Sequence, residues 1–101
     1  MAFVKIAPLD HLPPGTATHV EMGGNAIAVC NVAGELYAMD GTCPHARGPL
    51  GDGALHDHML VCPWHAWDFD CRTGESQVDS EIRLATYTVK VEEGDIWVDL
   101  P

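Results

Sequence analysis

Basic residues are scarce in this chain of 101 residues. It has 5 Lys and Arg against 15 Asp and Glu, which gives a formal net charge of −10. Such a surface repels the phosphate backbone of nucleic acids and the anionic face of membranes, so we expect neither as a partner. The same charge suits electrostatic steering toward a basic patch on a partner protein, and it also favours solubility.

Long apolar runs are absent as well. No stretch approaches the roughly 20 apolar residues of a membrane helix, and the first residues reach Pro8 and Asp10 without the apolar core of a signal peptide. We therefore expect a cytoplasmic protein. In that compartment, four cysteines indicate metal ligation or free thiols before disulfides.

Helical spacing of apolar residues is missing, and the short apolar runs are separated by Gly, Pro, Asn and Asp. This pattern predicts an all-β fold in a single domain, residues 1–101. The strand at 26–32 is apolar on both faces, which predicts a central position. Residues 85–92 and 96–100 alternate with period two across Glu93-Gly94, which predicts a hairpin. The expected strands are 3–7, 18–22, 26–32, 36–39, 85–92 and 96–100.

Aromatic residues are few, yet Trp64, Trp67 and Phe69 fall within six positions. They lie in segment 40–75, which is rich in Cys, His and Gly. A β-scaffold that carries such a segment is typical of a site held by loops. We interpret the three aromatic side chains as packing residues that exclude water, in preference to a binding box.

The same segment contains two short motifs, Cys43-Pro44-His45 and Cys62-Pro63-Trp64-His65. Two thiolates and two imidazoles suit either a tetrahedral zinc ion or a [2Fe-2S] cluster. Zinc knuckles usually offer two like ligands each, whereas each motif here offers one Cys and one His. This mixture favours a cluster in which both cysteines bind one iron and both histidines bind the other.

Two stretches, CPHARGPLGDG at 43–53 and CPWHAWDFD at 62–70, resemble the two cluster-binding loops of the Rieske family. The segments GELYAM at 34–39 and TGE at 73–75 resemble the flanking segments of that family. The likeness covers almost the whole chain. Ala66 departs from the pattern, because a Gly frequently follows the second His. Its methyl group narrows the approach to the cluster without removing a ligand.

The resemblance implies a Rieske-like antiparallel β-sandwich with a small cluster-binding subdomain of two loops at about residues 40–75. It also implies one Rieske-type [2Fe-2S] cluster per chain. The implied ligands are Cys43, His45, Cys62 and His65.

Within the family, the chain most resembles the stand-alone ferredoxins of bacterial aromatic-ring dioxygenase systems. The likeness implies a monomeric one-electron carrier, not an enzyme, between a flavin-dependent ferredoxin reductase and a terminal Rieske non-haem iron oxygenase. Motifs for a nucleophile–base pair, a phosphate loop or a dinucleotide site are missing. The alternatives are a small Rieske subunit of a nitrite reductase-like redox enzyme and a zinc-stapled interaction domain.

High-potential members of the family carry an extra disulfide between the loops, and Ser and Tyr hydroxyls that bond to the cluster sulfurs. The residues here at the matching positions can supply neither: Gly48, Trp64, Trp67 and Phe69. Fewer donors leave more negative charge on the sulfurs, so we expect a reduction potential of roughly −150 to 0 mV. Nearby carboxylates should act in the same direction if they face the site: Asp52, Asp68 and Asp70.

Two cysteines lie outside the motifs. Cys30, in an apolar strand, is expected to be a buried thiol. Cys71 is expected to be structural or partly exposed, with a ligand or redox-sensitive role as the alternative. The sequence leaves a Cys30–Cys71 disulfide open, but a reducing compartment argues against it. The remaining histidines are interpreted as surface residues: His11, His19, His56 and His58.

Overall fold

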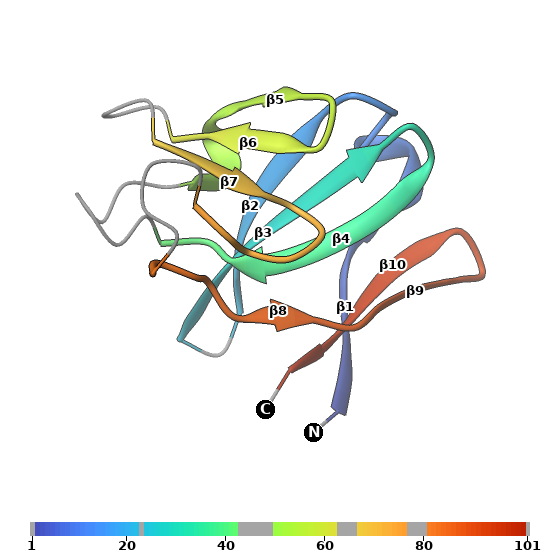
Figure 1. The fold of residues 1–101 in the computed structure, drawn as a ribbon. Coiled ribbons are helices and arrows are strands. Elements are labelled where there is room, and N and C mark those ends of the chain that lie inside the picture. Colours follow the sequence, from blue (N-terminus) through green and yellow to red (C-terminus); the bar gives the residue numbers. More distant parts are fainter. Residues whose placement is uncertain (1, 23, 43–49, 63–66, 77–80, 101) are drawn as a thin grey trace.

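The computed structural model describes residues 2–22, 24–42, 50–62, 67–76 and 81–100. In these ranges the chain forms ten strands and two short 3-10 helices, joined into three antiparallel sheets (Figure 1). No helix in the described ranges is long and apolar enough to cross a membrane. The N- and C-terminal ends of the chain lie near one another (Figure 1).

Each sheet is built from short strands, and the first and last strands of the chain pair with each other. The first sheet has the order β1 (Ala2–Pro8), β10 (Asp95–Leu100) and β9 (Val89–Glu92). The second has the order β2 (Ala17–Met22), β3 (Asn25–Val32), β4 (Glu35–Asp40) and β8 (Thr86–Tyr87). The third contains β5 (Ala54–His56), β6 (Met59–Val61) and β7 (Asp68–Asp70). The 3-10 helices are η1 (Leu9–His11) and η2 (Leu50–Asp52).

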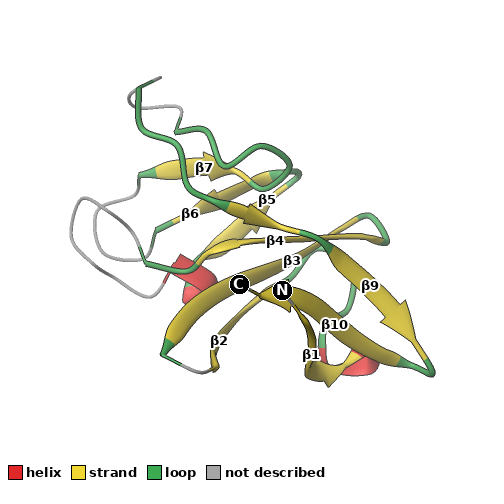
Figure 2. Ribbon diagram, turned by 90° about the horizontal axis from the view of Figure 1, so that it is seen from below, coloured by secondary structure: helices red, strands yellow, loops and turns green. Residues whose placement is uncertain are grey.

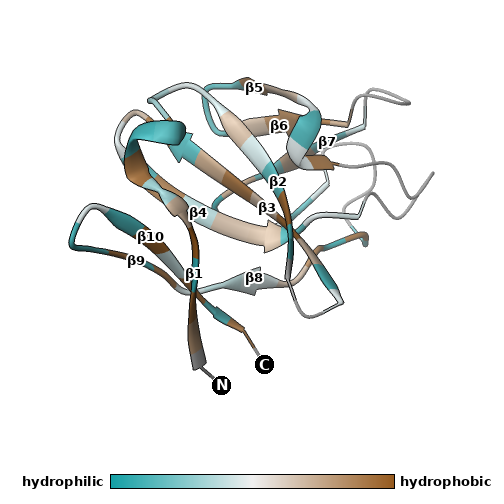
Figure 3. Cartoon of the chain, turned by 180° about the vertical axis from the view of Figure 1, so that it is seen from behind, coloured by the Kyte–Doolittle hydropathy of each residue, from teal (hydrophilic) through white to brown (hydrophobic). Residues whose placement is uncertain are grey.

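Strand β3 is buried on both faces, because successive side chains of a strand point to opposite sides of the sheet. Ala28 and Cys30 belong to one apolar core, and Ile27 and Val29 belong to the other. All four are fully buried. The second sheet accordingly lies between the other two (Figure 2), and the middle of β3 is strongly apolar (Figure 3). The prediction of a central strand is confirmed.

The two cores differ in what they support. The first core packs Ala28 and Cys30 against η2 and the third sheet, and its members include Leu50, Leu60 and Phe69. The second core packs the opposite face of β3 against β10. Every second residue of β10 is buried there, while the residues between them are partly exposed. These buried residues of β10 are Ile96, Val98 and Leu100.

The predicted all-β fold and antiparallel pairing are confirmed, but one predicted strand is wrong. The expected strands at 3–7, 18–22, 26–32, 36–39 and 96–100 each fall within an observed strand. The single strand expected at 85–92 is wrong, because it divides at Thr88: β8 pairs with β4, and β9 pairs with β10. Tyr87 and Val89 both pack against the second core, which explains why apolar residues alternate across Thr88. The alternation reflects this shared burial, although the two residues belong to strands with different partners.

The third sheet was missed by the sequence analysis, which expected loops in this region. Its strands have three residues each, too few for an alternating pattern to be recognised. Their pairing is regular, with Leu60 opposite both Leu55 and Phe69. This small sheet carries the segment in which the second motif lies.

Candidate metal centre

The second motif begins at the end of a strand, where the structure fixes Cys62. The residue follows β6 directly, and its backbone N–H donates a hydrogen bond of 2.7 Å to the carbonyl oxygen of Trp67. The adjacent pair, Val61 and Asp68, is already part of the β6–β7 ladder. Cys62 carries a free thiol and is 1% exposed. The hairpin therefore holds one predicted ligand rigidly at the base of the second loop.

The first loop is closed at its base in a similar way. The N–H of Leu50 donates to the carbonyl oxygen of Gly41 at 2.9 Å, which joins the two ends of the segment between them. The N–H of Gly41 donates to the carbonyl oxygen of Ala26, within β3, at 2.8 Å. Its position is crowded, since an added Cβ would lie 2.8 Å from backbone atoms of Ile27. The first loop thus begins and ends beside the open end of the β3–β4 hairpin.

The bases of the two loops meet in the first core. Leu50, at the end of the first loop, and Cys62, at the start of the second, are members of the same buried cluster. Gly53 lies so close to the carbonyl oxygen of Val61 that a side chain there would collide with it. A glycine is required at this point because η2 and β6 approach each other through their backbones. The fold therefore brings together the bases of the two loops.

Three of the four predicted ligands, Cys43, His45 and His65, lie outside the described residues. Gly48, Trp64 and Ala66, which the sequence comparison also singled out, lie outside them as well. The described neighbours of the second motif pack as expected: Phe69 is fully buried, and Trp67 is partly buried against the first core. The packing interpretation is confirmed for these two aromatic side chains.

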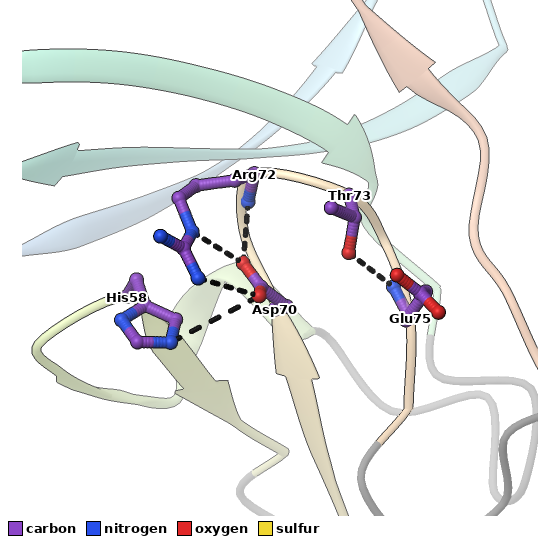
Figure 4. A network of polar contacts seen from close by, with 5 residues as sticks. All are labelled: His58, Asp70, Arg72, Thr73 and Glu75. Atoms are coloured by element: carbon purple, nitrogen blue, oxygen red, sulfur yellow. Dashed lines mark hydrogen bonds and ion pairs between the residues drawn. The ribbon is translucent and has the colours of Figure 1, made fainter.

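Asp70 is nearly buried, and its charge is balanced by Arg72 (Figure 4). Its Oδ1 accepts hydrogen bonds from the backbone N–H of Arg72 at 2.9 Å and from Nε at 3.1 Å. Its Oδ2 accepts a hydrogen bond from Nη2 of Arg72 at 3.1 Å and lies 3.9 Å from Nε2 of His58. Burial acts to raise the pKa of Asp70, but the hydrogen bonds and charge of Arg72 outweigh it and lower that pKa.

This pairing corrects one expectation about the site's charge. Asp70 was grouped with Asp52 and Asp68 as a source of negative charge near the motifs, but its carboxylate is compensated locally by Arg72. Asp52 is exposed, and Asp68 is partly exposed. The sequence could have suggested the pairing, because an acidic residue two positions before an arginine at a turn often bonds to the following backbone N–H.

The residues outside the motifs follow expectation in most cases. Cys30 is buried as predicted, and Cys71 is 1% exposed, so the idea of partial exposure was wrong. His11 and His56 are exposed, and the side chain of His58 is 39% exposed. His19 differs from the expected surface position, because it is half-buried and its Nδ1 atom is buried.

Comparison with known proteins decides the family. Residues 2–88 match the Rieske [2Fe-2S] domain. The chain belongs to the Rieske family. Its cofactor is accordingly a Rieske-type [2Fe-2S] cluster, and this finding decides against the zinc-stapled alternative. The antiparallel β-sandwich expected from the resemblance is the observed fold.

Named Rieske proteins match over nearly the full length of this chain. The ferredoxin component of biphenyl 2,3-dioxygenase from Rhodococcus jostii (strain RHA1) is 40% identical over 101 residues, which cover 99% of this chain and 94% of that protein. The ferredoxin of carbazole 1,9a-dioxygenase from Nocardioides aromaticivorans IC177 has a TM-score of 0.89 at 30% identity, with 100% of both chains covered. A chain from a complex of reduced oxygenase and oxidised ferredoxin in carbazole 1,9a-dioxygenase has a TM-score of 0.86 at 30% identity. The match covers 95% of this chain and 91% of that chain.

The described part of the Rieske site suits the cluster in its chemistry. A Rieske iron of the cysteine-ligated type needs soft thiolates, and Cys62 offers one that is not engaged in a disulfide. The reduction potential of an iron–sulfur cluster depends on its exposure to solvent. The apolar residues of the first core pack around Cys62. These relatives are named as ferredoxin components, so the chain is an electron carrier and not a catalyst.

The Asp70–Arg72 pair should make the stability of the domain depend on pH. A carboxyl group with a lowered pKa in the folded state contributes stability above its unfolded pKa, near 3.9, and loses that contribution as the pH falls through the folded pKa. We expect Asp70→Asn to lower the free energy of unfolding by about 1–2 kcal/mol at pH 7, since Arg72 is half-exposed and screened.

Urea unfolding of apoprotein at several pH values checks this prediction. The difference between wild type and Asp70→Asn should be constant above about pH 5 and shrink below about pH 4. Asp10→Asn is the matched control, because Asp10 is an exposed aspartate. A difference that stays the same down to pH 3 would contradict the assignment of the stabilisation to ionised Asp70.

Proposed function

We propose that this chain is the ferredoxin of an aromatic-ring dioxygenase system, which carries one electron to a terminal Rieske non-haem iron oxygenase. The observation that carries the proposal is the likeness, over almost the whole of both chains, to a stand-alone dioxygenase ferredoxin component. The structure with an oxygenase adds support, since the ferredoxin resembling this chain is there in complex with that partner. Two chains named as putative nitrite reductase small subunits share the fold, with TM-scores of 0.83 and 0.85, but they are only 21% and 23% identical to this chain. The higher identity to the dioxygenase ferredoxin component favours the carrier over the fixed subunit.

The ligands that we propose are Cys43, His45, Cys62 and His65. Supporting this choice, Cys62 is a buried free thiol at the base of one loop, and the base of the other loop lies in the same core. When bound, a Rieske cluster supplies a centre that accepts and releases one electron. The chain contributes the two loop bases, the thiol of Cys62 and an apolar wall that includes Phe69.

Ligand substitutions test this assignment. Cys62→Ser and His65→Ala should each abolish or alter the visible absorption and the EPR signal of the dithionite-reduced protein, with loss of bound iron and sulfide. Cys30→Ala is the matched control, since Cys30 is a buried cysteine of the same core and is not a proposed ligand. An unaltered chromophore in Cys62→Ser or His65→Ala would overturn the ligand set, provided that circular dichroism shows folded protein.

We also propose a low reduction potential, roughly −150 to 0 mV. Phe69 lies where a high-potential domain has a tyrosine, and it offers no hydroxyl group to the cluster sulfurs. Asp52 and Asp68 add negative charge near the loops, whereas the charge of Asp70 is offset by Arg72. The low value therefore depends chiefly on missing hydrogen-bond donors.

Protein-film voltammetry measures this potential directly. Phe69→Tyr should raise the midpoint by several tens of millivolts if its hydroxyl reaches a cluster sulfur. Asp52→Asn is the comparison that separates missing donors from surface charge. Its shift of the midpoint should become much smaller in high salt, because the charge of an exposed residue is screened there. A wild-type midpoint above about +150 mV would contradict the proposal.

The proposed donor is a flavin-dependent ferredoxin reductase, and the proposed carrier acts as a monomer in the cytoplasm. With a net charge of −10, it should be steered toward basic docking patches on both partners. Steering between exposed charges is screened by salt, so the association step should slow as the ionic strength rises.

Stopped-flow mixing of the reduced protein with an aromatic-ring oxygenase tests the function. Absorption changes should report reoxidation of the carrier, with a second-order rate constant that falls on the order of tenfold between 20 and 500 mM NaCl. The control is the same chain mixed with an oxygenase lacking its own Rieske iron. Co-purification with a large reductase subunit in a fixed ratio, and no transfer to any oxygenase, would favour the fixed-subunit alternative.

A further inference from the structure

Two thiols that are not among the proposed ligands lie in contact within the first core. The Sγ atoms of Cys30 and Cys71 are 2.8 Å apart, although the residues are separated by 41 positions in the chain. The side chains are 0% and 1% exposed, and both cysteines carry free thiols. The contact joins strand β3 of the central sheet to the turn that follows β7 of the third sheet.

Backbone hydrogen bonds hold both cysteines in place. Cys30 lies within β3, opposite Ala17 of β2 on one side and Tyr37 of β4 on the other. The N–H of Cys71 donates to the carbonyl oxygen of His58 at 2.8 Å, which fixes it to the β5–β6 connection. The sheets therefore fix the backbone positions of both cysteines.

The distance between the two sulfurs is shorter than that of ordinary packing. Non-bonded heavy atoms pack best at about 3.5–4.0 Å, whereas a disulfide bond measures about 2.05 Å. The observed 2.8 Å lies between these values. A side-chain movement of less than about 1 Å would bring the sulfurs to bonding distance.

We propose that Cys30 and Cys71 are a second redox site, a dithiol that a low-molecular-weight disulfide oxidises to an intramolecular disulfide. Each thiol gives up one proton and one electron. The disulfide oxidant takes up the two protons and two electrons and becomes two thiols. The exchange passes through a mixed disulfide, which the second cysteine resolves. The new bond covalently joins the central sheet to the sheet that carries Cys62.

The surroundings of the pair keep it a dithiol at rest. The hydrogen bond with Cys71, followed by burial, raises the pKa of the Cys30 thiol. Because the thiolate is the reactive form, oxidation is slow and requires the turn after β7 to open briefly. A reducing compartment is consistent with this behaviour, since the disulfide would form only when the thiol pool becomes oxidised.

The cross-link would have a measurable effect on unfolding. It closes a loop of about 40 residues, which restricts the unfolded chain and stabilises the folded one. For a domain of this size we expect the apparent Tm to rise by roughly 10 °C or more. The third sheet, with its strands of three residues, should gain most because it would no longer separate from β3.

Thiol counting on the cluster-loaded protein tests the proposal. The protein is incubated with oxidised glutathione, then denatured with excess N-ethylmaleimide at mildly acidic pH, which caps thiols released from the cluster. Of the four cysteines, four should be capped before oxidation and two after it. Peptide mapping with fragmentation should identify the uncapped pair as Cys30 and Cys71, and the visible absorption should be retained.

Cys30→Ala and Cys71→Ala provide matched controls. Each has three capped thiols before oxidation, and after oxidation the remaining cysteine of the pair is either a capped thiol or a glutathione adduct, with no intramolecular disulfide and no rise in apparent Tm on oxidation. Four capped thiols in oxidised wild type, or a disulfide that includes Cys43 or Cys62, would overturn the proposal. The first result leaves the proposed electron transfer untouched, because electron transfer is read from the absorption and EPR of the cluster.

Discussion

The burial of β3 on both of its faces is the constraint on which the remaining structure depends. Ile27 and Val29 fill the core against β10, while Ala28 and Cys30 fill the core beneath the loop bases. The two faces differ in side-chain size, because the face toward the third sheet has an alanine and a cysteine where the other has isoleucine and valine. The smaller side chains let η2 and the third sheet lie close to the central sheet, where Leu50, Leu60 and Phe69 complete the packing.

Backbone hydrogen bonds close the bases of the two loops. One hydrogen bond closes each loop base, from Leu50 to Gly41 and from Cys62 to Trp67. Gly53 permits η2 to touch β6 at Val61, one residue before Cys62. A cluster shared between two loops needs their ends to be fixed relative to each other, since a displacement of either base would move ligands on one side only. Gly41, Gly53 and the β6–β7 hairpin fix the two loop bases relative to each other.

The sequence predicted most of the fold and the family to which the chain belongs, and its errors have physical causes. Strands with four or more alternating residues, such as β3 and β10, were found because burial leaves a period of two. The division at Thr88 was missed because Tyr87 and Val89 face the same core from different sheets. The strands of the third sheet are too short to show a period. The pairing of Asp70 with Arg72 and the Cys30–Cys71 contact depend on tertiary structure, which single-residue patterns do not contain.

The positions of the three described cysteines in the fold explain why we propose different roles for them. Cys62 follows the last residue of a strand, so its thiol sits at the boundary between the apolar core and a loop. Cys30 is in the middle of a strand, and Cys71 is covered by the same core, so both are surrounded by protein. A thiol at a loop boundary can meet a ligand from a second loop, whereas a thiol inside the core can meet only another core side chain. For Cys30 that side chain is Cys71.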